Sequence, residues 1–410
     1  METQLFEQAL NISSPFFIES VDFQPDSKLL NIHINFKRGS KFDYIQDGKT
    51  QSCKAFDTKI KKWRHLNFFQ HECYLHVRVP RVKLDDGKVR QISMPWEGKS
   101  KGFTLLFEAL LMQLCKYMPV NQVGEIVNVS DDKLWTMLDR YIETAREHED
   151  FKDVVSIGVD ETSKKKHHDY ITLFVNMITR KTIFVTQGKS NKTIVDFVKD
   201  LEEHGGKAEN IKDVSCDMSP AFIKGVNENL PEAEITFDKF HILKIINKAV
   251  DTVRKQEAQD LNILTNTKYI FLKNNNKLTK NQSKKLSELS MPKLNLKSIR
   301  ALHIRENFQE IYNAENQNDF VKLLNKWYFW ATHSRLEPIK HAAYTIKRHW
   351  EGVVKWFESK INNGILEGLN SIIQACKAKA RGYKTFKNFA IITYLVTGNL
   401  KFNKVNSNIR

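Results

Sequence analysis

The chain has 410 residues, more than a single hydrophobic core usually serves, so we expect several domains. Hydrophobic residues make up 41% and charged residues 27%, a composition that excludes a disordered chain and is typical of a globular protein. Lys and Arg number 64 against 48 Asp and Glu, which leaves a formal net charge of +16. This excess favours a polyanionic partner, because Lys and Arg release counterions when they neutralise phosphates. A basic protein without such a partner is the alternative.

The cysteines and the apolar runs bear on the compartment. Five Cys are spread along the chain without a C-x-x-C pair, which argues against a disulfide framework and favours a reducing compartment. The first residues lack the basic and apolar regions of a secretory signal. No apolar run reaches the length of about 18 residues that a membrane span needs. We therefore expect a cytoplasmic, nucleoid-associated protein with no membrane partner.

Residues 1–100 alternate apolar and polar side chains, as at 29–36 and 74–79, and predict a β-rich segment. Residues 59–65 combine basic and aromatic side chains, which suits a nucleic-acid backbone; an ordinary solvated strand is the alternative. A zinc site is a further possibility, but zinc ribbons pair their ligands two to four residues apart at both ends of the cluster. That spacing is met only by His71, Cys73 and His76, so the pattern disfavours zinc.

Residues 101–150 change to helical periodicity and predict a helix-turn-helix. Pro119 ends a first helix, a short helix covers 120–127, and Ser130 begins a longer helix as its N-cap. A short helix, a tight turn and a longer helix are the outline of this DNA-binding motif; a plain three-helix bundle is the alternative. The outward face of the third helix is predicted to carry Lys133, Met137 and Arg140, with Lys133 and Arg140 as DNA contacts.

Residues 151–250 predict the first part of an α/β core. Three consecutive strands are expected at 154–160, 170–177 and 182–186, with a basic hairpin tip at 164–168 between the first two. Helices and strands then alternate: a helix capped by Asn191, a strand at 214–217, a helix from Pro220, a strand at 234–238 and a helix from Lys239. A right-handed crossover can return the fourth strand beside the first, which would make Asp160 and Asp217 neighbours.

Residues 251–350 predict a helical insertion, and residues 351–410 predict a return to the core through a helix that carries Glu367. The apolar residues of that helix recur at helical spacing and predict a buried stripe. A second stripe points the other way, and we expect it to offer a metal ligand and then follow a phosphate backbone; a solvated helix face is the alternative. The second stripe consists of Glu367, Asn370, Gln374, Lys377 and Arg381.

Asp160, Asp217 and Glu367 are the candidate catalytic residues. Asp160 and Asp217 each end an apolar, strand-like run, where a carboxylate is costly unless it has a function. Two acids at strand ends and one on a helix resemble the metal-holding triad of nucleases and transposases with the RNase H fold. The fold class expected is therefore α/β: an RNase H-like catalytic core with a helical insertion, preceded by a small β-rich segment and a helix-turn-helix domain.

The sequence around these acids is similar to the ISL-three branch of bacterial insertion-sequence DDE transposases. Further similar stretches lie upstream at 63–66, 79–82 and 94–96, so the resemblance covers most of the chain. The cysteine pairs that the family has before Trp63 and after Pro80 are absent, which departs from the family's zinc-binding segment. The central matching stretches are Ile157-Gly158-Val159-Asp160-Glu161-Thr162-Ser163, Cys216-Asp217-Met218-Ser219-Pro220-Ala221, Phe237-Asp238-Lys239-Phe240-His241, Asp251-Thr252-Val253-Arg254, Asn363-Gly364-Ile365-Leu366-Glu367-Gly368-Leu369-Asn370 and Ala380-Arg381-Gly382-Tyr383.

The resemblance implies Asp160, Asp217 and Glu367 as catalytic ligands of two divalent metal ions, Mg²⁺ or Mn²⁺. The expected reaction is DNA strand cleavage and strand transfer at insertion-sequence ends, with Lys377 and Arg381 holding DNA. Asp238 and His241 are candidates for supporting the ligands; a helix cap is the alternative.

The expected partners are double-stranded DNA, as transposon ends and target, and at least a second copy of the chain in the DNA complex. The alternatives are an RNase H-like nuclease or resolvase, and a catalytically inactive DNA-binding protein derived from a transposase.

Overall fold

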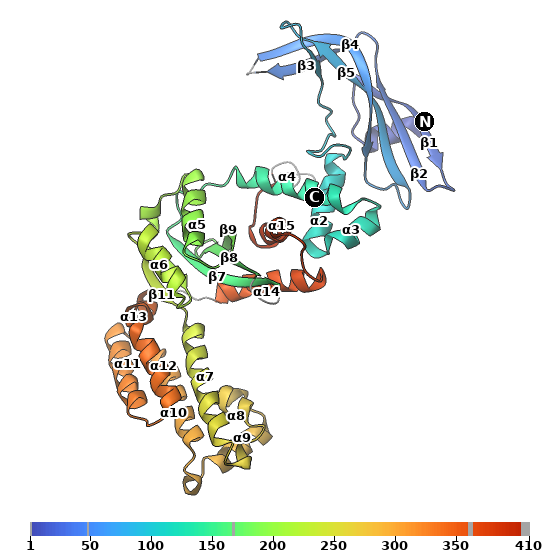
Figure 1. The fold of residues 1–410 in the computed structure, drawn as a ribbon. Coiled ribbons are helices and arrows are strands. Elements are labelled where there is room, and N and C mark those ends of the chain that lie inside the picture. Colours follow the sequence, from blue (N-terminus) through green and yellow to red (C-terminus); the bar gives the residue numbers. More distant parts are fainter. Residues whose placement is uncertain (1, 47–48, 166–168, 360–363, 403–410) are drawn as a thin grey trace. The chain divides into compact units, whose positions relative to one another are not determined.

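The computed structural model describes residues 2–46, 49–165, 169–359 and 364–402 (Figure 1). The chain divides into two compact units, one of Met1–His148 with Ala375–Arg410 and one of Glu149–Gln374. Both units contain helices and strands, so the fold is mixed α/β. Part of the predicted basic hairpin tip, residues 166–168, lies outside the described residues. Within the described ranges, no helix has the length and apolar character needed to cross a membrane.

A six-stranded sheet and the short helix α1 (Glu2–Ala9) form the N-terminal part of the first unit. The strand order is β1-β2-β5-β4-β3, and β6 pairs with β5. The strands predicted at 29–36 and 74–79 are confirmed, and their alternate apolar side chains pack with Trp63 in one core. The strands are β1 (Phe16–Gln24), β2 (Leu29–Phe36), β3 (Lys41–Gln46), β4 (Lys49–Arg64), β5 (Glu72–Lys83) and β6 (Val89–Gln91).

Four helices complete the first unit: α2 (Leu105–Tyr117), α3 (Val120–Val127), α4 (Asp131–Arg146) and α15 (Phe386–Thr397). The turn between α3 and α4 passes through Asn128 at φ 54°, and a Cβ on Gly124 would lie 2.6 Å from the Val129 carbonyl oxygen. Glycine at this position therefore lets the turn close tightly against α3.

Helix α15, from the far end of the sequence, packs against α2 and α4. Because α4 is covered on more than one side, Met137 is fully buried, and its predicted outward position is wrong. The other two side chains predicted on that face, Lys133 and Arg140, are exposed.

A buried carboxylate joins α2 to α4. Glu108 has no exposed surface, and its oxygens accept hydrogen bonds from the Lys99 and Ser100 backbone N–H groups and from the Tyr141 hydroxyl at 2.7–2.8 and 2.6 Å. Burial raises the pKa of Glu108, and the three donors partly offset this shift. The three hydrogen bonds connect the start of the helical region to its longest helix.

The second unit is built on a five-stranded sheet with the order β11-β10-β7-β8-β9. Strands β7, β8 and β9 pair antiparallel, whereas β10 and β11 run parallel to β7. A strand forms at each of the five predicted places, although β7 continues five residues beyond its predicted end at Asp160. The helices between the strands are α5 (Lys192–Glu203) and α6 (Pro220–Asn229). The strands are β7 (Ser156–Lys165), β8 (Asp169–Asn176), β9 (Lys181–Gln187), β10 (Asp213–Cys216) and β11 (Glu234–Phe237).

The helices after β11 lead away from the sheet and back to it (Figure 1). At the return, the Thr236 and Ser359 hydroxyls lie 3.2 Å apart, and a Cβ on Gly352 would lie 2.5 Å from the Phe237 ring. Helix α13 is therefore packed closely against the edge strand β11. The helices are α7 (Lys239–Glu257), α8 (Lys268–Leu272), α9 (Lys280–Leu289), α10 (Lys297–Ile311), α11 (Gln317–Thr332), α12 (Glu337–Arg348) and α13 (Trp350–Ser359).

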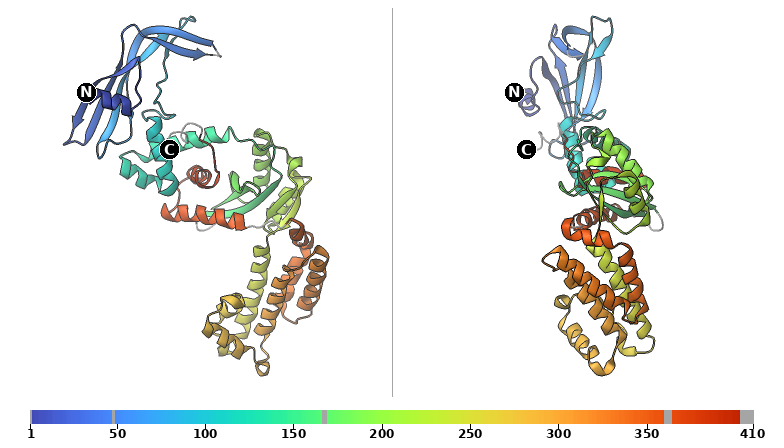
Figure 2. Two further views of the ribbon diagram at one scale, coloured as in Figure 1. Left: turned by 180° about the vertical axis from the view of Figure 1, so that it is seen from behind. Right: turned by 90° about the vertical axis from the view of Figure 1, so that its left-hand side faces the viewer.

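The next helix, α14 (Gly364–Lys379), lies along β7 (Figure 2), and the first unit resumes within this helix, at Ala375. Leu366 is buried in a small cluster with Val175, in β8, and Met177, which directly follows β8. A Cβ on Gly158 would lie 2.9 Å from the methyl carbons of Leu366 and 2.6 Å from the Met177 sulfur. The absence of a side chain at Gly158 therefore allows α14 to approach the sheet.

Replacing Tyr141 by Phe tests the buried carboxylate. Loss of one hydrogen bond to a charged acceptor should lower the free energy of unfolding by about 1.5–3 kcal/mol in urea denaturation at neutral pH. The loss should shrink as the pH falls through the raised pKa of Glu108, because the neutral acid needs the donor less. Tyr117→Phe is the matched control, since the Tyr117 side chain is 67% exposed. Equal effects of the two substitutions would contradict the role given to Glu108.

Replacing Gly158 by Ala tests the approach of α14. The added methyl group should cost about 1–3 kcal/mol by overpacking, and amide hydrogen exchange should accelerate in α14. Gly368→Ala is the matched control, because no described atom lies within 4 Å of the Cβ that it adds. That control should stabilise the helix by about 0.5–1 kcal/mol. Unchanged exchange in α14 of the Gly158 variant would show that the contact does not limit docking.

Candidate functional site

Three neighbouring strands carry an acid toward the same edge of the five-stranded sheet, and Asp217 and Asp238 both act electrostatically on Asp160. Asp217 directly follows β10, and Asp238 directly follows β11. Asp160 lies within β7, so the prediction that it ends a strand is wrong: β7 continues to Lys165 and pairs with β8 over that extension. The carboxyl ends of parallel strands share one edge of a sheet, which is where α/β proteins bind ligands.

Asp160 lies in a strongly acidic environment. It accepts hydrogen bonds from the Glu161 backbone N–H at 2.8 Å and from the side-chain amide of Asn370. Burial raises its pKa; the Glu161 N–H and His241 oppose the shift, and Asp217 and Asp238 add to it. A bound cation would reverse this cost, because a positive charge stabilises the ionised form.

Asp217 is held by its own turn. Its Oδ1 accepts the Ser219 backbone N–H at 3.0 Å, at the start of α6. Pro220 begins the helix, as predicted, and Ser219 occupies the N-cap position, but the Ser219 side chain makes no capping hydrogen bond. The Asp217 carboxylate takes the helix-terminal N–H instead, which orients one of its two oxygens.

Asp238 and His241 form a charged pair beside these acids. Asp238 is 6% exposed, caps α7 by accepting the Phe240 N–H at 3.0 Å, and lies 3.3 Å from His241 Nδ1. The neighbouring Asp238 carboxylate raises the pKa of His241; burial opposes this shift, and Asp160 and Asp217 reinforce it. The helix cap considered for Asp238 is therefore present, and the same carboxylate also contacts His241.

Glu161 is a further acid in this region, and the sequence did not single it out. Strand alternation suggested that it faces away from Asp160. Burial raises the pKa of Glu161, with a further increase from Asp217 and an opposing effect of Lys189. The side chain is therefore within electrostatic reach of Asp217, which strand periodicity alone could not indicate.

Glu367 is carried by α14, the helix that contacts Asp160 through Asn370. It is exposed in the first turn of the helix, one turn before Asn370. Asn370 donates to Asp160 Oδ2, and Gln374 donates to Thr162 Oγ1 and to the Ser163 carbonyl oxygen. The stripe that was predicted to follow DNA thus contacts β7 through its two amides. In the part of the chain that the structure describes, no three His, Cys, Asp or Glu side chains lie together closely enough to hold a metal ion.

The donors nevertheless suit a hard divalent cation. Asp160, Asp217 and Glu367 offer carboxylate oxygens, the ligand type that Mg²⁺ and Mn²⁺ prefer. The side-chain oxygen of Asn370 is buried beside Asp160 and has no hydrogen-bond partner among the described residues. A clustered negative charge and an unsatisfied acceptor are both stabilised by a cation.

Zinc was disfavoured from the sequence, and the closely spaced His71 and His76 make other contacts in the structure. The His33 and His76 rings stack 4.8 Å apart, His76 Nε2 lies 2.9 Å from Asn31 Oδ1, and the His71 ring packs on Phe23. Cys53 and Cys73 are free thiols.

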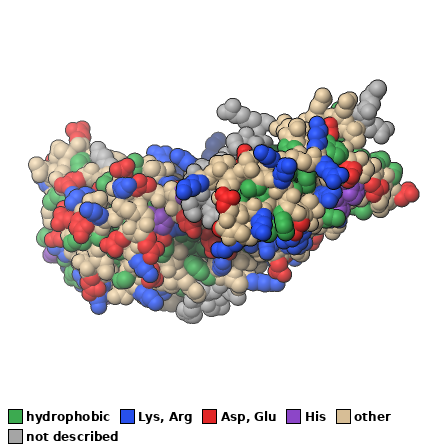
Figure 3. Space-filling view, turned by 90° about the horizontal axis from the view of Figure 1, so that it is seen from above, with side chains coloured by type: hydrophobic (Ala, Val, Ile, Leu, Met, Phe, Trp, Pro, Cys, Tyr) green, Lys and Arg blue, Asp and Glu red, His purple; other side chains and the backbone are tan. Residues whose placement is uncertain are grey.

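All four predicted DNA contacts belong to the first unit. Lys133 and Arg140 lie on the exposed side of α4, and Arg140 donates to the Lys99 carbonyl oxygen at 3.2 Å. Lys377 is in the last turn of α14, and Arg381 follows at φ 55°, exposed. On the face drawn in Figure 3, Lys and Arg side chains are interspersed with Asp and Glu, so charge is not gathered in one patch on that face.

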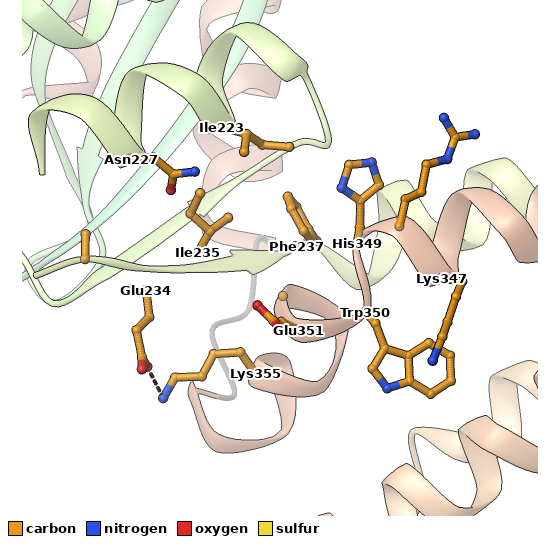
Figure 4. A pocket seen from close by; sticks show the side chains of 13 residues that line it. Ile223, Asn227, Glu234, Ile235, Phe237, Lys347, His349, Trp350, Glu351 and Lys355 are labelled. Atoms are coloured by element: carbon orange, nitrogen blue, oxygen red, sulfur yellow. Dashed lines mark ion pairs between the residues drawn. The ribbon is translucent and has the colours of Figure 1, made fainter. Parts of the chain in front are cut away.

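A pocket of about 550 Å³ lies between β11, α6 and the junction of α12 with α13 (Figure 4). Its wall includes Lys347, Arg348 and His349, and the ion pair between Glu234 and Lys355 closes one side. None of Asp160, Asp217 and Glu367 lines it.

Three protein-family models match parts of this chain. Residues 157–393 match the ISL3 family of DDE transposases, described as Transposase. Residues 92–142 match the helix-turn-helix domain of transposase family ISL3. Residues 45–83 match the zinc-finger of transposases IS204, IS1001, IS1096 and IS1165.

Two relatives match along nearly their whole length. The transposase for insertion sequence element IS1001 of Bordetella parapertussis is 24% identical over 382 residues, covering 91% of this chain and 93% of that transposase. The transposase for insertion sequence element IS1557 of Mycobacterium tuberculosis is 21% identical over 415 residues, covering 93% and 92%. Because the catalytic family model spans more than half of the 410 residues, the chain belongs to the ISL3 family of DDE transposases.

Proposed function

We propose that this DNA transposase cleaves DNA strands at insertion-sequence ends and transfers them to target DNA in a metal-dependent reaction. The observation that carries the proposal is the contact of Asn370 with Asp160, which docks the helix bearing Glu367 on the strand beside Asp217. The strand order β9-β8-β7-β10-β11, with three antiparallel strands followed by two parallel ones, supports an RNase H-like core. In the same proposal, α7 to α13 form a helical insertion within that core.

Asp160, Asp217 and Glu367 would hold two divalent cations, Mg²⁺ or Mn²⁺. Such cations supply positive charge to the attacking and leaving oxygens of phosphoryl transfer. Asp238 and His241 would support the site as an ion pair beside Asp160 and Asp217. Water would first release a 3′-hydroxyl at the element end, and that hydroxyl would then attack the target strand. The protein's part in both steps is positioning and charge stabilisation.

DNA binding would rest on the first unit. The helix-turn-helix would contact the element end through α4, with Lys133 and Arg140 at phosphates or base edges. Lys377 and Arg381 would bind backbone phosphates, and the β-rich segment would add further contacts. We propose the segments 1–100, 101–150, 151–250, 251–350 and 351–410 as the functional divisions of the chain. We also propose a cytoplasmic, nucleoid-associated protein that acts on its ends as a dimer or larger assembly.

Alanine at Asp160, Asp217 or Glu367 should lower the rate of end cleavage by about 10³-fold or more, because several kcal/mol of charge stabilisation are lost. The measurement is cleavage and joining of an element-bearing plasmid with Mg²⁺ or Mn²⁺, together with gel-shift binding of an end fragment. Binding should stay within about threefold of the unsubstituted protein.

Glu202→Ala, which removes an exposed acid of α5, is the control and should cleave normally. Undiminished cleavage by any of the three variants would remove that residue from the site. Cleavage without joining to a second duplex would favour a nuclease or resolvase.

Alanine at Lys133 or Arg140 should weaken binding of an end fragment and reduce the salt dependence of log Kd by about one unit per lost phosphate contact. Fluorescence anisotropy at several salt concentrations measures both quantities. Lys224→Ala, which removes an exposed lysine paired with Glu228, should change neither. A salt slope that is unaltered in both α4 variants would place the DNA contacts elsewhere.

A further inference from the structure

Asn370 uses only half of its side-chain amide. Its Nδ2 donates to Asp160 Oδ2, whereas its Oδ1 is buried and finds no donor among the described residues. A buried acceptor without a partner costs about 1–3 kcal/mol, so native structures rarely keep one without a function.

Asp160 dictates which end of the amide is left over. An ionised carboxylate only accepts hydrogen bonds, so the NH₂ group must face it. Turning the amide over would place two oxygens against each other and leave the NH₂ group unpaired. The unsatisfied atom is therefore an oxygen as long as Asp160 is charged.

The surroundings of this oxygen favour a cation. Asp217 and Asp238 act on the same Asp160 carboxylate and His241 opposes them, so three acids surround one histidine at this position. Glu367 lies three residues earlier on α14, and positions three apart on a helix have Cβ atoms about 5–6 Å apart. Amide oxygens are, like carboxylates, hard ligands for divalent cations.

The place of Asn370 is also set independently of Asp160. Gln374, one turn further along, donates to Thr162 Oγ1 and to the Ser163 carbonyl oxygen. One turn earlier, Leu366 is packed into the space left by Gly158. Contacts on both sides hold the helix, so the amide of Asn370 is free to serve a ligand rather than needed only for docking.

We propose that Asn370 is a fourth metal ligand of this transposase, with Oδ1 binding a divalent cation and Nδ2 orienting Asp160. The inference rests on the proposed function, because it uses the same metal site. It adds a neutral oxygen ligand to the three acids and assigns the helix two tasks, carrying Glu367 and completing the coordination. An exclusively positioning role for Asn370 is the competing explanation.

Direct Mn²⁺ binding to the full-length, DNA-free protein, followed by calorimetry and by electron paramagnetic resonance, distinguishes the two. Asn370→Leu should weaken Mn²⁺ binding by about 10–100-fold. Asn370→Asp keeps an oxygen and loses the NH₂ donor, so it should bind Mn²⁺ within a few-fold of the unsubstituted protein. Gln374→Leu is the matched control: it removes the other amide contact between α14 and β7, and Mn²⁺ affinity should change less than about threefold.

Amide hydrogen exchange in α14, measured on the same variants, reports whether the helix stays docked on β7 and so separates helix docking from metal ligation. If the Asn370→Leu and Gln374→Leu variants lose Mn²⁺ affinity equally, or if Asn370→Asp binds as weakly as Asn370→Leu, the ligand assignment is overturned and Asn370 only positions the helix. Asp160→Ala tests the underlying function separately. Unchanged Mn²⁺ binding by that variant would reject the proposed metal site as a whole, whatever Asn370 does.

Discussion

The site depends on the register between α14 and β7. Three positions of the helix, Leu366, Asn370 and Gln374, face three alternate positions of the strand, Gly158, Asp160 and Thr162. Eight residues of helix rise about 12 Å and four residues of strand about 13 Å, so steps of four on one element match steps of two on the other. The match extends over two turns and determines how far along the strand Glu367 lies.

This register is specified chemically at each step. A shift of one residue along the helix turns it by about 100° and would bring Leu369 or Ser371 to Asp160. Leu369 has no hydrogen-bond donor, and leaving the buried carboxylate without one costs free energy. Leu366 would also no longer pack over Gly158. The apolar contact of Leu366 and the amide donors of Asn370 and Gln374 therefore select one alignment of α14 on β7. The position of Glu367 depends on this alignment, because the chain reaches α14 only more than a hundred residues after Asp238.

The strands and helices of the second unit could be predicted because each has a strong local pattern. Strands β8 to β11 and helices α5 to α7 begin and end close to the positions expected from apolar runs and from capping residues such as Asp238. The end of β7 could not be predicted, because residues after Asp160 are polar and owe their strand conformation to pairing with β8. The outward position predicted for Met137 is wrong for a similar reason. Helix α4 also packs against α15, which follows Met137 by more than two hundred residues. Local periodicity reports one buried face and is silent about distant segments.

The candidate site shows the same division between local and distant information. Asp160, Asp217 and Glu367 were identified from acids in apolar contexts and from the family resemblance. The contacts of Asn370 and Gln374 were not, because a polar stripe on a helix is compatible with solvent, DNA or a polar strand edge. What decides among these is the strand that the helix meets: Asn370 donates to Asp160, and Gln374 donates to Thr162 and to the Ser163 carbonyl oxygen. The amide of Asn370 thus lies against Asp160, the carboxylate proposed to be catalytic, so the docking of α14 on β7 also positions that carboxylate.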